Sequence, residues 1–189
     1  MKTCHQLLIA VMLLCFSVST GCGQQKDTTI KHIRQLFQRI NSDHTLKTLE
    51  LGEEAFPEME NEGAAPDGGV SMTASYKKDT VYKIKIWIGV SYCVREYEYY
   101  FSDGKLFFIY ETEKDFPGDG QGALNYEKLV LAFEGRYYIN DGKIVDIKVT
   151  GKKRGGAKTT AATVQALMAN ADSYVKTVAA RLKKMKAGK

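Results

Sequence analysis

The chain has 189 residues, a formal net charge of +5 and 44% hydrophobic residues, which suits one domain with a hydrophobic core. Three of its four cysteines lie within the first 22 residues. Cys93 therefore stands alone in the rest of the chain, and a single cysteine excludes both an intramolecular disulfide and the thiolate cluster of a structural zinc site. We expect no metal and no cofactor, and we expect Cys93 to be a buried, inert thiol.

The N-terminus has the parts of a bacterial lipoprotein signal. Lys2 supplies a positive charge, an apolar run extends from residue 7 to residue 18, and small residues precede Cys22. The run is too short to span a bilayer of about 30 Å. We predict that residues 1–21 are a lipoprotein signal peptide, that Cys22 is acylated, and that residues 22–26 tether a single domain, residues 27–189, to the outer membrane. An ordinary cleaved signal peptide is the alternative.

Charge is divided unevenly along the chain. Residues 22–150 hold 16 Lys and Arg against 21 Asp and Glu, whereas residues 151–189 hold 10 against 1. The basic end could contact an anionic surface or an acidic partner, although a solvated helix face is the simpler interpretation. Nucleic acid is not an expected partner of an exported protein.

A helix is predicted directly after the tether. Apolar residues recur at helical spacing from Ile30 to Ile40, and Asp27 or Thr28 is available as N-cap. Residues 45–51 alternate and could form a short strand. Residues 55–69, rich in Gly, Pro and acids, are typical of a loop.

The middle of the chain predicts about six strands. Their expected ranges are residues 70–76, 81–90, 92–101, 105–113, 129–139 and 143–150. Asp103-Gly104 and Asp141-Gly142 separate two pairs of these runs, and Asp-Gly between such runs is a strong hairpin signal. These two hairpins also repeat one another with an offset of 38 residues. We therefore predict an antiparallel meander.

Charge pairing predicts the register of the last two hairpins. A three-residue loop with Gly142 left-handed would set Arg136 against Asp146, and the same loop at Gly104 would set Arg95 against Glu111. Opposite-charge cross-strand pairs contribute roughly 0.2–1 kcal/mol each, so this register is preferred to a two-residue turn.

A long helix closes the chain, because apolar residues follow the helical period from Val164 to Met185. We expect an α+β fold in which the antiparallel β-meander is flanked by the N-terminal helix and this long C-terminal helix.

Aromatic residues fall on both faces of the predicted sheet. Tyr97, Tyr99, Phe101 and Phe107 share one face, and Tyr100, Leu106, Phe108 and Tyr110 share the other. One helix can cover only one face, so the second face is either covered by the N-terminal helix or left as a binding surface. The possible binding face consists of Trp87, Tyr100, Phe108 and Tyr110.

Two further groups of charged residues are candidate sites. Lys152, Lys153 and Arg154 precede the last helix and could contact an anion or a lipid headgroup. Glu96 and Glu98 share a strand face and could resemble the carboxylate pair of a glycosidase, although a charged sheet face is the simpler interpretation. No Ser–His–Asp or Cys–His arrangement is supported, so no catalytic residue is predicted.

Three segments run from Trp87 to Tyr92, from Glu98 to Phe108 and from Phe133 to Lys143. Together they resemble a family of uncharacterised lipoproteins from Bacteroidota-type bacteria, which carries repeated hairpins of this kind. The resemblance implies a lipid anchor at Cys22 and the hairpin architecture, and it brings no activity.

These observations predict a membrane-anchored lipoprotein of the cell envelope that acts as a non-enzymatic binding or interaction module. Its partners would be the membrane, through the anchor, and an envelope protein or an anionic surface. The alternative is a structural or inhibitor-like protein that uses the acidic segment from Glu50 to Asp67 against a basic target. An envelope hydrolase is the third possibility.

Overall fold

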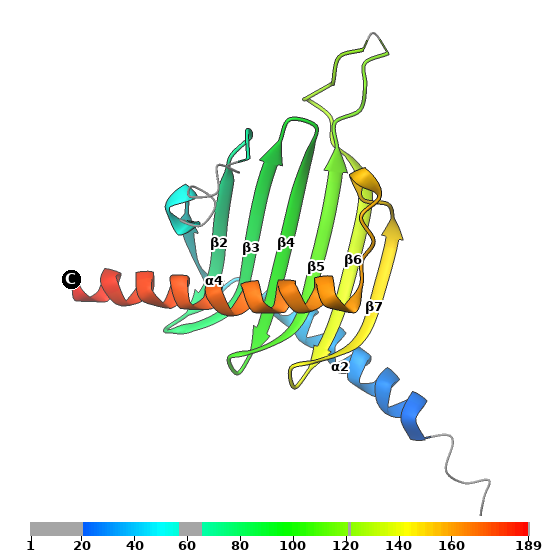
Figure 1. Ribbon diagram of the computed structural model, residues 1–189. Coiled ribbons are helices and arrows are strands. Elements are labelled where there is room, and N and C mark those ends of the chain that lie inside the picture. Colours follow the sequence, from blue (N-terminus) through cyan, green and yellow to red (C-terminus); the bar gives the residue numbers. More distant parts are fainter. Residues whose placement is uncertain (1–20, 57–65, 121, 189) are drawn as a thin grey trace, which may run out of the picture.

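A single seven-stranded antiparallel sheet organises the domain, and two helices flank it (Figure 1). The computed structural model describes residues 21–56, 66–120 and 122–188, so the predicted signal peptide lies outside the described residues except for Gly21. The strands are β1 (Lys47–Leu51), β2 (Val70–Lys77), β3 (Thr80–Val90), β4 (Cys93–Ser102), β5 (Lys105–Asp115), β6 (Val130–Asn140) and β7 (Lys143–Gly151). The helices are α2 (Gly21–Ser42) and α4 (Ala161–Ala187), and two short 3-10 turns are η1 (Glu53–Ala55) and η2 (Arg154–Gly156).

The strands lie side by side in chain order, which confirms the predicted meander and the α+β class. In addition to the six predicted strands, the sheet contains β1. Its Leu49 and Leu51 alternate with polar neighbours and face the core. It pairs with β2 along its whole length, Lys47 opposite Tyr76 and Leu51 opposite Met72.

The register of the last hairpin differs from both sequence-based alternatives. Asn140 pairs with Lys143 across a two-residue turn in which Asp141 and Gly142 have φ values of 47° and 73°. A two-residue turn with positive φ at both positions matches the right-handed twist of the flanking strands. One extra residue on β7 then sets Arg136 opposite Lys148, and Asp146 opposite Tyr138. The predicted three-residue loop is wrong because turn geometry outweighs cross-strand charge.

The same construction recurs in three hairpins. In β2–β3, β4–β5 and β6–β7, a two-residue turn is followed by a bulge whose extra residue is Tyr82, Phe107 or Val145. At a bulge two residues oppose one, which re-aims the side chains. Phe107 and Phe108 consequently pack in the same cluster with α2, and Tyr82 and Val145 pack at its margin. Leu106 turns to the opposite face, so the expected places of Phe107 and Leu106 are exchanged. Likewise Arg95 faces Glu113, and the predicted partner Glu111 faces Tyr97.

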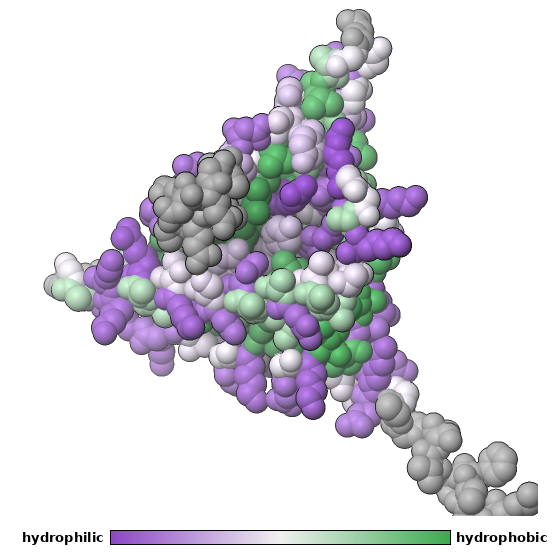
Figure 2. Space-filling model, viewed as in Figure 1, coloured by the Kyte–Doolittle hydropathy of each residue, from purple (hydrophilic) through white to green (hydrophobic). Residues whose placement is uncertain are grey.

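Helix α4 covers one face of the sheet and crosses its strands at a steep angle (Figure 1). Val164, Ala171, Val178 and Leu182 are buried against the sheet in one cluster with Ile84 and other strand residues. Its outward side carries many hydrophilic side chains, especially near the C-terminal end (Figure 2). The helix begins at a capping box, in which Thr160 and Thr163 exchange side chain to backbone hydrogen bonds.

Helix α2 covers part of the opposite face with Ile30, Ile33 and Ile40. It begins at Gly21, so the predicted tether, residues 22–26, is helical, and the predicted caps Asp27 and Thr28 lie inside the helix. Lys26 reaches the sheet, where its Nζ lies 2.8 Å from Asp146 Oδ1. Cys22 belongs to the first turn of the same helix that packs in the core. Within the described part of the chain, neither helix is apolar over a stretch long enough to cross a membrane.

The packing of α2 predicts a large effect of Ile33→Ala. Ile33 is 3% exposed, and truncating such a side chain removes apolar contacts and leaves a cavity. We expect the free energy of unfolding to fall by about 3 kcal/mol in urea denaturation. Gln35→Ala, on the exposed side of α2, is the control and should change it by less than about 0.5 kcal/mol. Equal effects of the two substitutions would show that α2 does not pack on the sheet.

Candidate functional site

The predicted binding face is largely covered by α2. Tyr100 is fully buried and Phe108 is 5% exposed. The Phe37 ring of α2 lies 4.9 Å from the Tyr100 ring and 5.4 Å from the Phe108 ring, measured between centroids. The N-terminal helix therefore lies over both rings, so Tyr100 is a core residue and Phe108 keeps only a small exposed edge, which lines the groove beside α2.

Trp87 and Tyr110 remain partly exposed but do not form one patch. Trp87 lies on β3 opposite Glu96, whereas Tyr110 lies on β5 opposite Glu98. The Trp87 ring folds over Gly89, where a Cβ atom would come within 2.5 Å of it. Only Tyr110 borders the surface beside α2.

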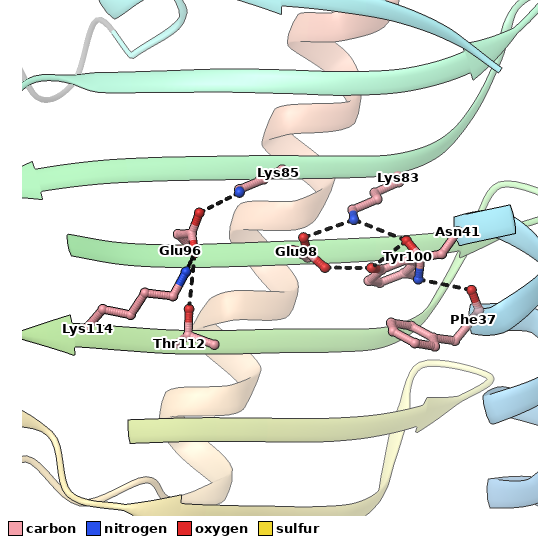
Figure 3. A network of polar contacts seen from close by, with 9 residues as sticks. All are labelled: Phe37, Asn41, Lys83, Lys85, Glu96, Glu98, Tyr100, Thr112 and Lys114. Atoms are coloured by element: carbon pink, nitrogen blue, oxygen red, sulfur yellow. Dashed lines mark hydrogen bonds and ion pairs between the residues drawn. The ribbon is translucent and has the colours of Figure 1, made fainter. Parts of the chain in front are cut away.

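A polar network fixes the end of α2 to the sheet (Figure 3). The Tyr100 hydroxyl donates to Glu98 Oε2 at 2.5 Å, and Lys83 Nζ lies 2.9 Å from Glu98 Oε1. Lys83 also donates to Asn41 Oδ1 at 3.2 Å, and the Asn41 amide donates to the Phe37 carbonyl at 3.1 Å. Burial and the neighbouring Glu98 carboxylate raise the pKa of Tyr100. The network therefore holds Phe37 over the sheet.

Glu96 belongs to the open half of this sheet face and is paired with lysines from both neighbouring strands, Lys85 and Lys114 (Figure 3). Burial works to raise the pKa of Glu96, but the two lysines hold it below its ordinary value. A general acid needs the opposite shift. Glu98 is likewise committed to Lys83 and Tyr100. The arrangement fits a charged sheet face and offers no acid–base pair for hydrolysis.

A groove of about 440 Å³ lies between α2 and strands β5, β6 and β7. Its apolar and aromatic walls come from Ile33, Phe37, Phe108, Tyr110 and Tyr138, and its polar rim comes from Arg34, Gln38, Arg136 and Lys148. The volume falls in the range of roughly 300–1,000 Å³ that is usual for small-molecule sites. Four aromatic rings and three cations therefore converge on one hollow.

The three cations of the rim have different surroundings. Arg136 is paired with Glu134, and Lys148 Nζ lies 3.8 Å from Asp146 Oδ2. Arg34 makes no ion pair among the described residues, and its guanidinium carbon lies 5.9 Å from the centre of the Tyr138 ring.

Tyr110 belongs to the same rim. Its hydroxyl donates to Glu134 Oε1 at 2.6 Å. Burial and this bond raise the pKa of Tyr110 to about 12, so its hydroxyl is neutral at physiological pH and keeps its donor proton for Glu134.

A larger hollow of about 590 Å³ lies where α4 passes two hairpin turns. Its walls include the turn glycines, the Lys105–Asp141 ion pair and Asp172, and it contains no aromatic ring. Because Lys105 and Asp141 are already paired with each other and the lining has no aromatic ring, it offers less to an organic ligand than the groove beside α2.

The predicted anion contact is not available as a whole. Lys153 Nζ lies 2.5 Å from Glu111 Oε1, and the Arg154 backbone N–H donates to Glu113 Oε1 at 2.6 Å. Lys152 is exposed and has no such contact among the described residues. Lys153 and the backbone of Arg154 bind carboxylates of β5, whereas the exposed Arg154 guanidinium lies 3.9 Å from Asp115 Oδ2. An anion contact through Lys152 and Arg154 stays a prediction. We call this set, Lys153 and Arg154 with Glu111 and Glu113, the connector clasp, since it fastens the segment between β7 and α4.

The carboxylates of the connector clasp are deeply buried, each residue being 3% exposed. Glu111 also accepts a hydrogen bond of 2.5 Å from the Tyr137 hydroxyl, and Glu113 accepts one of 3.0 Å from Arg95 Nε. Tyr137 reaches Glu111 across Gly135, where a Cβ atom would lie 2.2 Å from the Tyr137 oxygen. Buried carboxylates of this kind require such partners.

Cys93 lies next to the connector clasp. Its Sγ and one carboxylate oxygen each of Glu113 and Asp115 lie within 4.8 Å of one another. Burial and the nearby Glu113 raise the pKa of the Cys93 thiol, and metal binding needs the thiolate. Arg95 also occupies Glu113. The chemistry of this donor set therefore fits a structural thiol better than a cation ligand.

The acidic segment of the alternative function is only partly described. Residues 57–65 lie outside the described residues, and the described part includes η1, with Ala55 and Phe56 buried in the core beside α4.

Comparisons of the chain with known protein families, with curated proteins and with solved structures find no match. The site therefore has to be judged from its own geometry. Sequence patterns identified Phe108 and Tyr110 of the groove but missed Arg34, Arg136, Tyr138 and Lys148, because only the position of α2 and the bulged register bring these residues together.

The connector clasp predicts that substitutions of two neighbouring lysines change the free energy of unfolding to very different extents. Lys153→Met leaves the Glu111 carboxylate buried without its cation, and breaking such a pair costs about 3 kcal/mol or more. Lys152→Met removes the same charge from an exposed position and should change the free energy of unfolding by less than about 0.5 kcal/mol. Chemical denaturation at neutral pH measures both. Similar stabilities of the two variants would contradict the clasp.

Proposed function

We propose that the protein is a lipid-anchored binding module of the cell envelope, which acts by holding a ligand rather than by covalent chemistry. The anchor is inferred from the sequence around Cys22 and from the resemblance to envelope lipoproteins. The binding site is the groove between α2 and the sheet. The single observation that carries the proposal is the gathering of Phe37, Phe108, Tyr110 and Tyr138 around one hollow.

The groove suits binding for physical reasons. Aromatic walls provide a large apolar contact area together with defined geometry. Phe37 and Phe108 are held edge to face, with an interplanar angle of 77°, and Phe108 contacts Tyr138 at 5.1 Å between ring centres. Because these rings are already packed against one another, a ligand would not have to order them. Little of the binding free energy would then be lost to rearrangement.

Chemistry at the site has less support. Tyr110 and Arg136 of the groove both contact Glu134, so this carboxylate has a donor and a cation already. Histidine and cysteine are absent from the lining of the groove. A binding role uses the residues that are present, whereas general acid–base catalysis would need a free group of matched pKa.

The anchor predicts the mass and the behaviour of the mature protein. Intact mass spectrometry of protein isolated from membranes should show a chain that begins at Cys22 and carries acyl groups. Cys22→Ser should shift the protein from the membrane fraction to the soluble fraction. A mature chain with an unmodified Cys22, or one cut elsewhere, would contradict the anchor.

The groove predicts that filling it blocks binding. Gln38 lies on the rim and is exposed, so Gln38→Trp places an indole in the hollow without disturbing the core. We expect this variant to bind the neutral fluorescent probe 1-anilinonaphthalene at least about tenfold more weakly than the unaltered protein. Gln35→Trp adds the same side chain to an exposed position of α2 that does not line the groove.

Fluorescence titration of the three proteins measures the effect. If Gln35→Trp weakened binding as much as Gln38→Trp, or if the unaltered protein did not bind the probe, the groove would not be the binding site.

A further inference from the structure

We propose that the groove selects small amphipathic anions, and that Arg34 is the residue that recognises the anionic group. This inference rests on the proposed binding function and adds the chemical class of the ligand. The ligand would have an apolar or aromatic body and one carboxylate-like group at its end. The argument follows from the charge, the position and the partners of Arg34.

Arg34 is a charged group at the mouth of an aromatic hollow. A guanidinium stays protonated at any physiological pH. Among the described residues Arg34 forms no ion pair, whereas Arg136 is paired with Glu134 and Lys26 with Asp146. No carboxylate in the described part of the chain therefore matches its charge.

The position of Arg34 is defined by an aromatic ring. Its guanidinium carbon lies 5.9 Å from the centre of the Tyr138 ring, within the distance at which cation–π attraction acts. Tyr138 is 2% exposed and belongs to the core cluster under α2. A fixed ring beneath a flexible side chain reduces the number of positions that the guanidinium samples, which lowers the entropy lost when an anion binds.

The charges around the groove favour anions as a whole. Arg34, Arg136 and Lys148 line it. The carboxylates that pair with these cations are Glu134, which binds Arg136, and Asp146, which lies near Lys148 and also binds Lys26. Three lining cations against two carboxylates leave an excess positive charge, so a cationic ligand is disfavoured.

The apolar walls restrict the anion to an amphipathic one. Phe37 and Phe108 line the same groove as Arg34, and inorganic anions gain nothing from such walls. A ligand whose body contacts these walls would bring its terminal group to the guanidinium at the rim. The planar fork of arginine binds carboxylate-like groups through two parallel hydrogen bonds.

Two probes that differ in one group test the inference. 8-Anilinonaphthalene-1-sulfonate has the same aromatic body as 1-anilinonaphthalene and adds a single anionic group. We expect the full mature protein to bind the sulfonate about tenfold more tightly, equivalent to about 1.4 kcal/mol. Arg34→Gln should reduce this ratio to about one, because it removes the guanidinium and keeps a polar side chain at the rim. Arg39→Gln removes the same charge from α2 at an exposed position outside the groove and should keep the ratio.

Each possible result of the titrations tests a different part of the proposal. Equal affinities of the unaltered protein for the two probes would overturn the inference and leave the proposed groove intact. An Arg39→Gln variant that lost the ratio as fully as Arg34→Gln would overturn the role of Arg34, because the preference would then come from net charge. Binding of neither probe would overturn both the inference and the proposed function.

Discussion

The bulge that follows the two-residue turn in the hairpins β2–β3, β4–β5 and β6–β7 is the constraint on which the architecture depends. It sends an additional side chain, Tyr82, Phe107 or Val145, toward α2. An unbulged meander would leave this face with the ordinary alternation of polar and apolar residues. With the bulges, both faces of the sheet carry apolar surface near the turns, and the fold needs two helices to cover them. Helix α2 is consequently part of the core, and the groove exists because α2 covers only part of its face.

Strand β5 connects the two halves of the structure. On one face Glu111 and Glu113 hold the segment that leads into α4, and on the other face Phe108 and Tyr110 line the groove beside α2. Removing one methylene from a buried side chain of β5 would therefore disturb the packing of both α2 and α4, since close-packed interiors transmit strain. The buried glutamates add little net stability compared with apolar residues, but they fix one arrangement of the connector, because every other arrangement would leave them unpaired.

Local patterns in the sequence were sufficient to predict the elements but not their exact pairing. Alternation and Asp-Gly turns placed β3 to β7, and helical spacing placed α4. The predicted register of the β6–β7 hairpin is wrong because a cross-strand charge pair contributes at most about 1 kcal/mol. Arg136 instead pairs with Glu134 on its own strand. The groove could not be predicted, since it depends on that register and on the docking of α2. Lys153 looked like an anion contact because its partner Glu111 is 42 residues away in the chain.

Helix α2 runs without interruption from Gly21 to Ser42, through Cys22, Ile33 and Arg34. If Cys22 carries the acyl chains, the lipid anchor is joined to the domain through a rigid helix instead of a flexible linker. Twelve residues separate Cys22 from Arg34, which is about 18 Å along a helix. The height of the groove above the lipid surface is then set by helix geometry rather than by the entropy of a linker, and the domain has a preferred orientation. A ligand that partitions into the headgroup region would meet the groove at a fixed depth. A force on the anchor would act directly on the core of the protein, because α2 is part of that core.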